Sequence, residues 1–496
     1  MRLKGNEPKY KRESGILLHL SSLPDRYGIG SLGGEAYRFI DFLKSSRQSC
    51  WQLLPLCPVG KGNSPYSSVS AFAGELLFID LELLVSDGLL NPADIPDPDF
   101  PQNVNYRAVR EFKLPLIKKA AENFDPRSRD FKRFCRENEF WLDDFALFSA
   151  IKEVKRKKSF LELDDGLKYR LPAAVQQFRN RHAEKILFYK ITQYFFFSQY
   201  MRLKSYANEN GIKLIGDIPF YVQLESADVW SNPDNFRLGR DMTPVLVAGV
   251  PPDIFSADGQ LWGNPIYDWD YQKNDGYGWW KRRLMHNSTM YDIIRIDHFR
   301  AFADYYTIPY GAETARSGTW EKGAGLGFWN AVKESVRAEI IAEDLGGDTP
   351  EVKKLVSDTG FPDMKVLQFA FSSDLSNQFL PKNYGRNCVC YTGTHDNDTT
   401  RGWYEKATDR ERLMFSRLVP ADKSGSAVLS LISYAMKSKA RMVIIPMQDY
   451  LELDSSARLN TPGVPSGNWE WRLSPDDLDE NLEKTVRRLS SGRNRD

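Results

Sequence analysis

The sequence has 496 residues, enough for two or three average domains or for one large barrel with insertions. Hydrophobic residues make up 42% and charged residues 27% of it, proportions typical of a globular protein with a packed core. The formal net charge of +1 gives no overall field that would attract nucleic acid or an anionic membrane, so we expect neither as a partner. Five cysteines are too few, and odd in number, for a disulfide framework.

The first residues, Met1 to Glu13, are charged and lack the apolar segment of a secretory signal. The most apolar helical stretch, Ile186–Leu203, contains Lys190 and Arg202 and falls short of a membrane span. We therefore expect a cytoplasmic protein. A mature plastid form, from which a targeting segment has been removed, would have the same features.

Eight short β-rich runs recur along the chain, and the later ones alternate with helix-like stretches at Gly327–Ala338, Thr349–Thr359 and Asp409–Lys437. Strands that alternate with helices indicate a parallel sheet, and eight such units predict a closed (β/α)₈ barrel of the α/β class, the TIM barrel. The eight predicted strands are Gly15–His19, Trp51–Leu56, Lys213–Ile218, Asp292–Asp297, Glu339–Glu343, Lys365–Phe371, Cys388–Thr392 and Arg441–Met447.

Two connections are too long for a bare barrel. Residues 57–212, after the second strand, contain Pro-rich turns followed by charged, amphipathic helical sequence. Residues 219–290, after the third strand, are rich in Gly, Pro and Trp. We expect both to be insertions in loops on the catalytic face of one barrel that spans residues 1–496, the first of them mainly helical.

Acidic residues stand at or just after the ends of four predicted strands, where barrel enzymes carry their chemistry. A single such acid is more often an ion-pair partner or a helix cap. Four at matching positions favour a catalytic site, although Asp217 taken alone is better explained by a bond to the neighbouring loop. The four acids are Asp217, Asp297, Glu343 and Asp396.

On the fourth strand, period-2 alternation places Arg295 and Asp297 on one face and two isoleucines on the other. The isoleucines suit the layer that faces the helices, so Arg295 and Asp297 are expected to point into the barrel. A neighbouring guanidinium lowers the pKa of a carboxyl group and keeps it ionised, as a nucleophile requires. Glu343 follows an apolar run, where burial favours the protonated form that a proton donor needs. Such a pair of carboxyl groups is the arrangement for cleaving a glycosidic bond.

The sequence resembles the amylomaltases, also called 4-α-glucanotransferases or disproportionating enzymes, which are relatives of the α-amylase barrels. The resemblance runs from about Gly15 to Trp471 and rests on seven segments in the same order. These segments are Ser21–Gly33, Gly62–Ser68, Gly216–Val222, Val247–Trp269, Arg295–Phe302, Ile341–Gly346 and Tyr391–Thr399.

The resemblance implies a retaining glucanotransferase that acts on α-1,4-glucans and glucose in starch, glycogen or maltose metabolism. It gives Asp297 as the nucleophile, Glu343 as the general acid/base, and Asp396 as the acid that grips and distorts the sugar. Further substrate contacts are expected from the strand ends, from an aromatic residue under the donor glucose, and from a mobile loop over the cleft that begins at Asp253. These residues are Tyr66, Asp217, Asp253, Trp262, Asn264, Arg295, His298 and His395.

The chain departs from the family pattern at Ala301 and at Cys57, where glycine is common. A methyl group at position 301 affects the shape of a sugar subsite and leaves the acids unchanged. No HExxH or paired CxxC pattern occurs, so we expect no metal and no organic cofactor.

Two other functions fit parts of this pattern. A retaining α-glucan hydrolase would use the same acids with water as the acceptor, and only the resemblance favours transfer over hydrolysis. A non-catalytic glucan-binding protein would be expected to lack one of the acids, and all three are present.

Overall fold

The computed structural model describes residues 11–156, 159–252, 257–346, 349–372, 374–491 and 495. Its central feature is a parallel sheet of eight strands in the order β10-β11-β12-β1-β2-β3-β6-β9. The two end strands also approach each other, because the Ala342 N–H, at the end of β9, donates to the Pro362 carbonyl, just before β10, at 3.0 Å. The expected (β/α)₈ barrel is confirmed. The strands are β1 Glu13–Leu17, β2 Cys50–Gln52, β3 Lys213–Ile218, β6 Ile293–Ile296, β9 Glu339–Ala342, β10 Asp363–Val366, β11 Cys388–Tyr391 and β12 Met442–Pro446.

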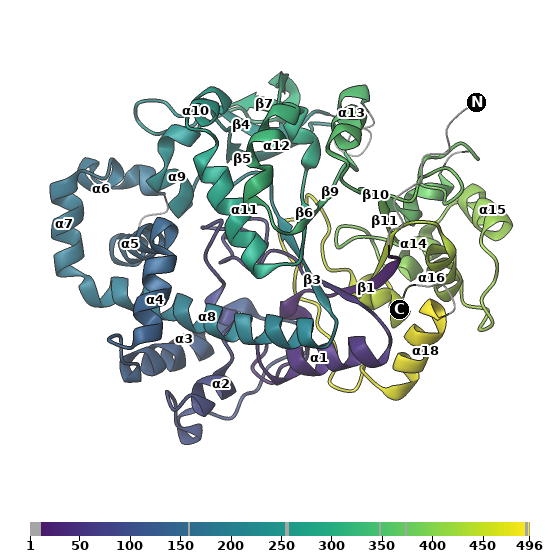
Figure 1. The fold of residues 1–496 in the computed structure, drawn as a ribbon, viewed down its shortest axis with the longest axis horizontal. Helices are drawn as coiled ribbons and strands as arrows, with labels where there is room; N and C mark the ends of the chain where they lie inside the picture. Colours follow the sequence, from purple (N-terminus) through teal and green to yellow (C-terminus); the bar gives the residue numbers. More distant parts are fainter. Residues whose placement is uncertain are drawn as a thin grey trace.

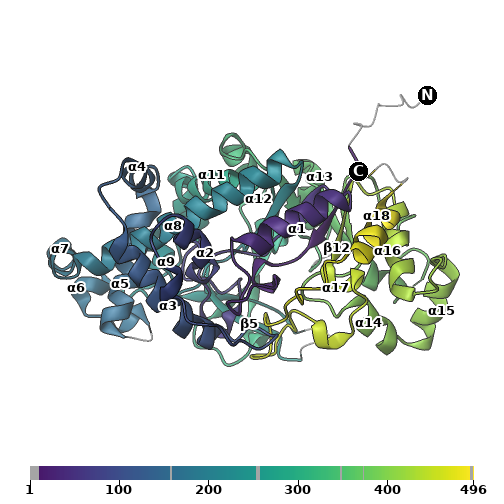
Figure 2. The same ribbon diagram turned by 90° about the horizontal axis from the view of Figure 1, so that it is seen from below.

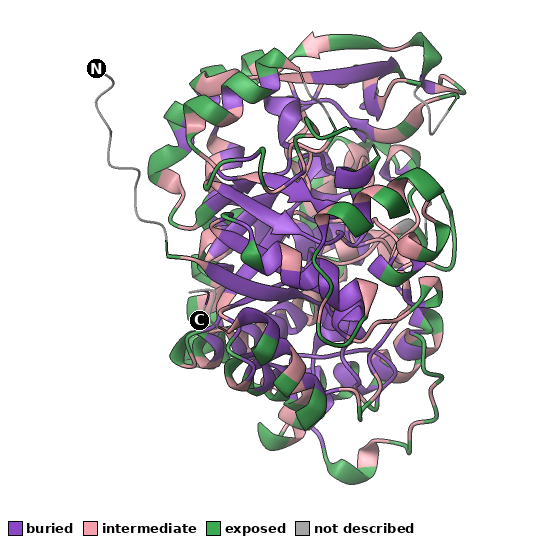
Figure 3. Cartoon of the chain, turned by 90° about the vertical axis from the view of Figure 1, so that its right-hand side faces the viewer, coloured by how far each residue is buried: buried purple, intermediate pink, exposed green. Residues whose placement is uncertain are grey.

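Burial explains why these runs form strands. Every residue of β1, β6, β11 and β12 is buried. This is expected for parallel barrel strands, because one face packs against the barrel interior and the other face packs against the helices. Figure 3 shows the buried strands at the centre of the molecule and exposed residues along the surrounding helices. Two strands end several residues earlier than predicted: β2 ends at Gln52, and β10 gives way after Val366 to the 3-10 turn Leu367–Phe371.

Helices surround the barrel, and the labelled helices after residue 400 lie on its right-hand side in Figure 1. The predicted helix 409–437 is two helices, because Pro420 cannot continue a helix and Gly425 has a positive φ of 77°. The helices around the barrel are α1 Gly34–Ser45, α11 Gly278–Met290, α12 Gly325–Val332, α13 Pro350–Thr359, α14 Thr400–Lys406, α15 Asp409–Leu418, α16 Ala427–Lys437, α17 Met447–Tyr450 and α18 Glu480–Ser490.

Residues between β2 and β3 form a group of helices on the left-hand side of Figure 1. Seen from below in Figure 2, α7 and α15 lie at opposite ends of the molecule, with the barrel between them. Within the described ranges no helix is long and apolar enough to pass through a membrane. The group consists of α2 Leu81–Ser86, α3 Tyr106–Asn123, α4 Arg129–Glu137, α5 Glu139–Lys155, α6 Asp165–Lys168, α7 Pro172–Arg181 and α8 Ala183–Glu209.

The segments on either side of β6 build a second, antiparallel sheet in the order β5-β4-β7-β8, which the sequence analysis did not predict. One face of this sheet carries a small cluster of buried residues, Val247, Tyr306, Ile308 and Ala315, apart from the main core. Short strands broken by Gly and Pro resemble loop sequence, so their pairing is visible only in the fold. The strands are β4 Leu246–Val250, β5 Gln260–Pro265, β7 Asp304–Pro309 and β8 Thr319–Lys322, with two short helices nearby, α9 Ala227–Ser231 and α10 Trp269–Asn274.

Glycine at position 216 is a packing requirement of β3. A Cβ atom there would lie 2.2 Å from Cδ2 of the buried Tyr291 ring, closer than any real contact. We expect Gly216→Ala to lower the free energy of unfolding by about 1–3 kcal/mol, the usual cost of overpacking a core. Urea denaturation followed by tryptophan fluorescence measures this.

The matched control is Gly34→Ala at the first position of α1, where nothing lies within 4 Å of an added Cβ. Its unfolding midpoint is expected to stay at the wild-type value or rise slightly. Equal midpoints for Gly216→Ala and the wild type would contradict the packing argument.

Candidate active site

Three of the predicted acids lie side by side at the carboxyl ends of neighbouring strands. Asp217 is in β3, Asp297 directly follows β6 and Glu343 directly follows β9, and these strands are adjacent in the sheet. The fourth, Asp396, lies in the loop between β11 and α14. The barrel therefore gathers all four on its catalytic face.

Arg295 links two of these acids. Its Nη1 lies 2.7 Å from Asp217 Oδ2, 2.8 Å from Asp217 Oδ1 and 3.0 Å from Asp297 Oδ1. The register of β3 and β6 pairs Asp217 directly with Arg295, so both side chains point to the same face of the sheet. The expectation that Arg295 and Asp297 share a face, opposite the fully buried Ile294 and Ile296, is confirmed.

Asp217 is the most deeply buried of the acids, with a side chain that is 0% exposed. Besides the Arg295 guanidinium it accepts a hydrogen bond from the Tyr66 hydroxyl at 2.8 Å. Asp217 thus holds Arg295 and Tyr66 in place, whereas 28% of the Asp297 side chain surface stays open to the cleft.

Backbone N–H groups fix the Glu343 carboxyl group. The His298 N–H donates to Glu343 Oε2 and the Leu345 N–H donates to Oε1, both at 2.7 Å. His298 adopts the left-handed conformation with φ of 53°, which is unfavourable for a residue with a side chain. The strained residue that follows Asp297 therefore ties the loop after β6 to the loop after β9.

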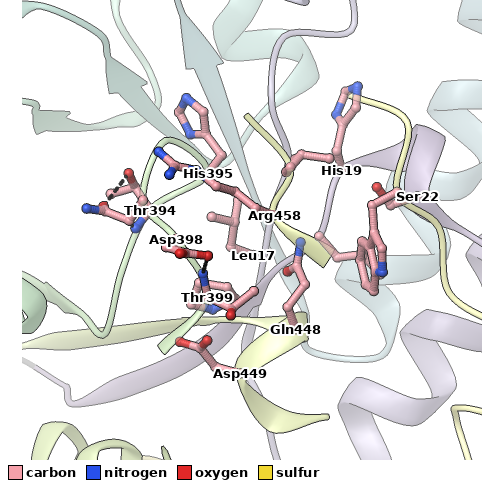
Figure 4. A pocket seen from close by; sticks show the side chains of 15 residues that line it. Leu17, His19, Ser22, Thr394, His395, Asp398, Thr399, Gln448, Asp449 and Arg458 are labelled. Atoms are coloured by element: carbon pink, nitrogen blue, oxygen red, sulfur yellow. Dashed lines mark hydrogen bonds between the residues drawn. The ribbon is translucent and has the colours of Figure 1, made fainter. Parts of the chain in front are cut away.

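Asp396 is the most open of the acids, with 47% of its side chain exposed. Asn460 Nδ2 donates to its Oδ1 at 2.6 Å, and His395 Nε2 lies 3.3 Å from the same oxygen. Arg458 Nη2 donates to the Asp396 carbonyl at 2.6 Å. Figure 4 shows the side of this loop that faces the protein interior, with His395 and Arg458 close to each other.

Asp297, His298 and Asp396 border a cleft of about 340 Å³, a size within the usual range for small-ligand sites. Tyr66 and His395 stack face to face, with ring centroids 5.1 Å apart and planes 16° from parallel. The Trp262 indole N–H donates to Gln260, and its ring meets His298 edge-on. The cleft is lined by Ser64, Tyr66, Ser67, Pro219, Phe220, Tyr221, Gln223, Gln260, Trp262, Asn264, Asp297, His298, His395, Asp396, Asn460, Pro462 and Trp469.

The electrostatic expectation for Asp297 was wrong in its net direction. Burial at the bottom of the cleft raises the pKa of Asp297 to about 8. Arg295 lowers this pKa, as predicted, but the negative charges of Asp217, Glu343 and Asp396 add to the effect of burial. One guanidinium shared between two carboxylates does not compensate for both, because Asp217 takes two of the three short contacts.

The two histidines of the cleft are uncharged at neutral pH. Burial lowers the pKa of His298 to about 4, and burial also lowers the pKa of His395 although Asp396 opposes it. A neutral imidazole has one donor and one acceptor nitrogen, which suits sugar hydroxyl groups.

Most of the predicted substrate contacts border the cleft, and the sequence analysis missed some neighbours. Asn264 lines it while donating to the Val222 carbonyl at 2.9 Å, and Asp253 lies outside the described residues. Asn460 and Trp469 were not predicted. They lie in the turn-rich segment 460–469 after the last strand, and a loop in that position could have been expected to reach the cleft. In the part of the chain that the structure describes, no group of three or more His, Cys, Asp or Glu side chains could hold a metal ion.

Comparison with known proteins agrees with this geometry. Over 489 residues the chain is 44% identical to the 4-alpha-glucanotransferase of Streptococcus pneumoniae, covering 97% of each chain. It is 41% identical over 498 residues to the chloroplastic/amyloplastic 4-alpha-glucanotransferase of Solanum tuberosum, covering 98% of this chain and 86% of the relative.

A solved structure of amylomaltase from Streptococcus agalactiae in complex with acarbose superposes with a TM-score of 0.95 at 39% identity, covering 98% of this chain and 100% of the other. The pattern of the 4-alpha-glucanotransferase family (Glyco_hydro_77) matches residues 18–478. The chain belongs to the 4-alpha-glucanotransferase family and is a glucanotransferase enzyme.

Proposed function

We propose that this protein transfers α-1,4-glucan segments to glucose or to another α-glucan through a covalent intermediate on Asp297. The observation that carries the proposal is the connection of Asp297 and Glu343 through one strained residue, His298, at the floor of an aromatic-lined cleft. Asp297 is open to the cleft and Glu343 is immobilised beside it, as a nucleophile and an acid/base need to be.

In the first step Asp297 Oδ attacks the anomeric carbon of the donor, and the bond from that carbon to the glycosidic oxygen breaks. Glu343 gives its proton to the leaving oxygen, and the shortened glucan departs. In the second step a hydroxyl of the acceptor attacks the same carbon, its proton goes to Glu343, and the ester bond to Asp297 breaks. Two inversions retain the α configuration.

Arg295 favours the ionised form of Asp297 that the first step uses. Burial and the neighbouring acids favour the protonated form, and Arg295 is the positive charge in contact with this carboxyl group. Asp396, with the largest exposed fraction of the three reacting acids, is proposed to hold the hydroxyls of the sugar at the cleavage site.

Transfer requires that a bound hydroxyl outcompetes water at roughly 55 M, and well-oriented groups reach effective molarities of about 10⁵ M or more. Tyr66 and Trp262 offer stacking faces for the donor and acceptor glucose rings. We propose that residues 257–267, which include β5, cover the cleft and exclude water during transfer; Asp253, where the predicted loop begins, lies outside the described residues.

The chain is proposed to work as one catalytic barrel, with residues 57–212 and 219–290 as insertions around the cleft. Its glucan and glucose substrates are water-soluble, and all five cysteines are free, as is usual in a reducing compartment. We propose the cytoplasm as its location, with the stroma of a plastid as the alternative.

Asp297→Asn is expected to lower turnover by about 10⁴-fold or more, because it removes the nucleophile and keeps its shape. The same change is expected to raise stability by on the order of 1 kcal/mol, because it removes a carboxyl group that burial and three like charges disfavour. Turnover on maltotriose and thermal unfolding measure the two effects.

The stability gain depends on pH with a defined sign. The folded protein binds the Asp297 proton more tightly than the unfolded chain, so the wild type loses stability as pH rises from about 4 to about 8. The advantage of Asp297→Asn over the wild type therefore grows across this window and is constant above it. Near-normal turnover of the repurified variant would remove Asp297 as the nucleophile, and an advantage that shrinks with pH would contradict the electrostatic account.

Glu343→Gln separates the two catalytic roles. The variant is expected to be crippled on natural glucans, because the leaving oxygen stays unprotonated. A glycosyl fluoride needs little acid assistance, so the variant still forms the intermediate and accumulates it. Mass spectrometry of the peptides then finds the glycosyl adduct on Asp297. No adduct in Glu343→Gln, together with an adduct on Glu343 when Asp297→Asn is treated with the same fluoride, would reverse the assignment.

Maltotriose distinguishes a transferase from a hydrolase. A transferase converts it into glucose and a ladder of longer glucans while total reducing ends stay nearly constant, because each turnover breaks one glycosidic bond and makes another. Chromatography by chain length and a reducing-end assay measure both quantities, and excess glucose is expected to shift the ladder toward short chains. Reducing ends that rise in step with the consumption of maltotriose would establish the hydrolase instead.

A further inference from the structure

The loop 392–400 carries His395 and Asp396 and is the least directly anchored part of the active site. Asp217, Asp297 and Glu343 stand in or directly after barrel strands, whereas Asp396 is separated from the end of β11 by Thr392 and the residues after it. The position of Asp396 in the cleft therefore depends on the contacts that hold this loop.

Hydrogen bonds within the loop and from its neighbours fix its middle part. Asn397 Oδ1 accepts from the Thr394 N–H at 2.9 Å and from the Thr394 hydroxyl at 3.0 Å. The Asp398 carbonyl accepts from Gln368 Nε2 at 2.9 Å, and its carboxylate accepts from Lys406 Nζ at 2.6 Å. Contacts from outside therefore hold the middle of the loop, where Asn460 and Arg458 also bind Asp396, and the two ends need an anchor of their own.

One carboxylate holds both ends. Asp449, in α17 directly after β12, is 1% exposed. Its Oδ2 accepts from the Thr392 hydroxyl and from the Thr400 hydroxyl, both at 2.6 Å, and its Oδ1 accepts from the Thr400 N–H at 2.7 Å. In Figure 4 Asp449 lies below Thr399, on the side of the loop away from His395.

We propose that Asp449 is a positioning residue for the transfer reaction. It holds the two ends of the loop 392–400 and so keeps Asp396 and His395 at their positions relative to Asp297. The inference rests on the proposed function, in which Asp396 binds the reacting sugar. Hydrogen bonds to an ionised acceptor are about twice as strong as neutral ones, and three of them converge on this single buried group. Displacing a catalytic group by about 1 Å can lower the reaction rate about 100-fold. The three hydrogen bonds of Asp449 therefore affect the rate although Asp449 touches no substrate.

Asp449→Leu removes both acceptor oxygens and with them all three hydrogen bonds, and the control below carries the same increase in side-chain volume. We expect kcat on maltotriose to fall by about 100-fold while KM changes by less than about 3-fold, because the sugar contact is strengthened in the transition state. Asp449→Asn retains an oxygen for the Thr400 N–H, and its amide can donate to the two hydroxyls. It is expected to recover at least about 10-fold of the loss.

Thr392→Val and Thr400→Val remove one hydroxyl donor each and leave the Thr400 N–H bond to Asp449. They keep the proposal testable if Asp449→Leu folds poorly, and each is expected to lower kcat by several-fold. The matched control is Asp80→Leu, at a carboxylate that is 3% exposed and accepts from the Ser31 hydroxyl and the Leu83 N–H away from the cleft. It is expected to lose stability as Asp449→Leu does and to retain the wild-type kcat.

A double-mutant cycle separates positioning from general stability. If Asp449 acts through Asp396, then Asp449→Leu costs less than about 3-fold in a protein that already carries Asp396→Asn, measured with a glycosyl fluoride as donor. Hydrogen exchange followed by mass spectrometry is expected to show faster exchange confined to peptides of 392–400. The same factor lost in both backgrounds, or unchanged exchange in that loop, would overturn the proposal.

A different variant tests the role of Asp396 in the proposed function separately from the role of Asp449. Asp396→Asn with wild-type turnover would refute the role of Asp396 itself, whatever Asp449→Leu does. Loss of activity in Asp396→Asn, together with wild-type kcat in Asp449→Leu and in both threonine variants, would refute only the role of Asp449.

Discussion

The ion pair of Arg295 with Asp217 and Asp297 is the interaction on which the active site depends. A guanidinium that is 4% exposed is stable only if carboxylates compensate its charge, and β3 and β6 supply them in register. Asp217 compensates most of that charge and also fixes the Tyr66 hydroxyl. Asp297 receives the remaining contact, so it is held in place while part of its surface stays open to a substrate.

The site places closely spaced carboxyl groups, which are electrostatically unfavourable, at the ends of tightly packed barrel strands. Ile294 and Ile296 are fully buried, whereas Asp297, Glu343 and Asp396 gather negative charge in one cleft. Burial raises the pKa of Asp297, and His298 adopts a left-handed backbone between the two proposed catalytic carboxyl groups. The barrel tolerates this because its strands are buried and hydrogen-bonded around nearly the whole circle.

Sequence patterns predicted those features that depend on local periodicity. Alternation in β6 gave the shared face of Arg295 and Asp297, and apolar runs gave all eight barrel strands within a few residues. The antiparallel sheet of β4, β5, β7 and β8 was missed because the pair that joins its two halves, β4 with β7, lies across β6, a long-range relation without a local signal. The pKa of Asp297 was predicted with the wrong net sign because one neighbour, Arg295, was visible in sequence, whereas burial and the three other acids arise only on folding.

Closure of the barrel also explains why residues distant in the chain meet in the cleft. In the sheet β12 lies between β11 and β1, and β2 follows β1, so the loops after β2, β11 and β12 come together. Tyr66 stacks on His395, and Trp469 lies 6.0 Å from Tyr66 and 5.9 Å from His395 between ring centroids. Asn460 and Asp449 approach Asp396 and its loop from the same C-terminal segment. Asp396 is thus held in part by residues that come after the last strand, so a change in that segment moves Asp396 while Asp297 and Glu343 keep their own supports.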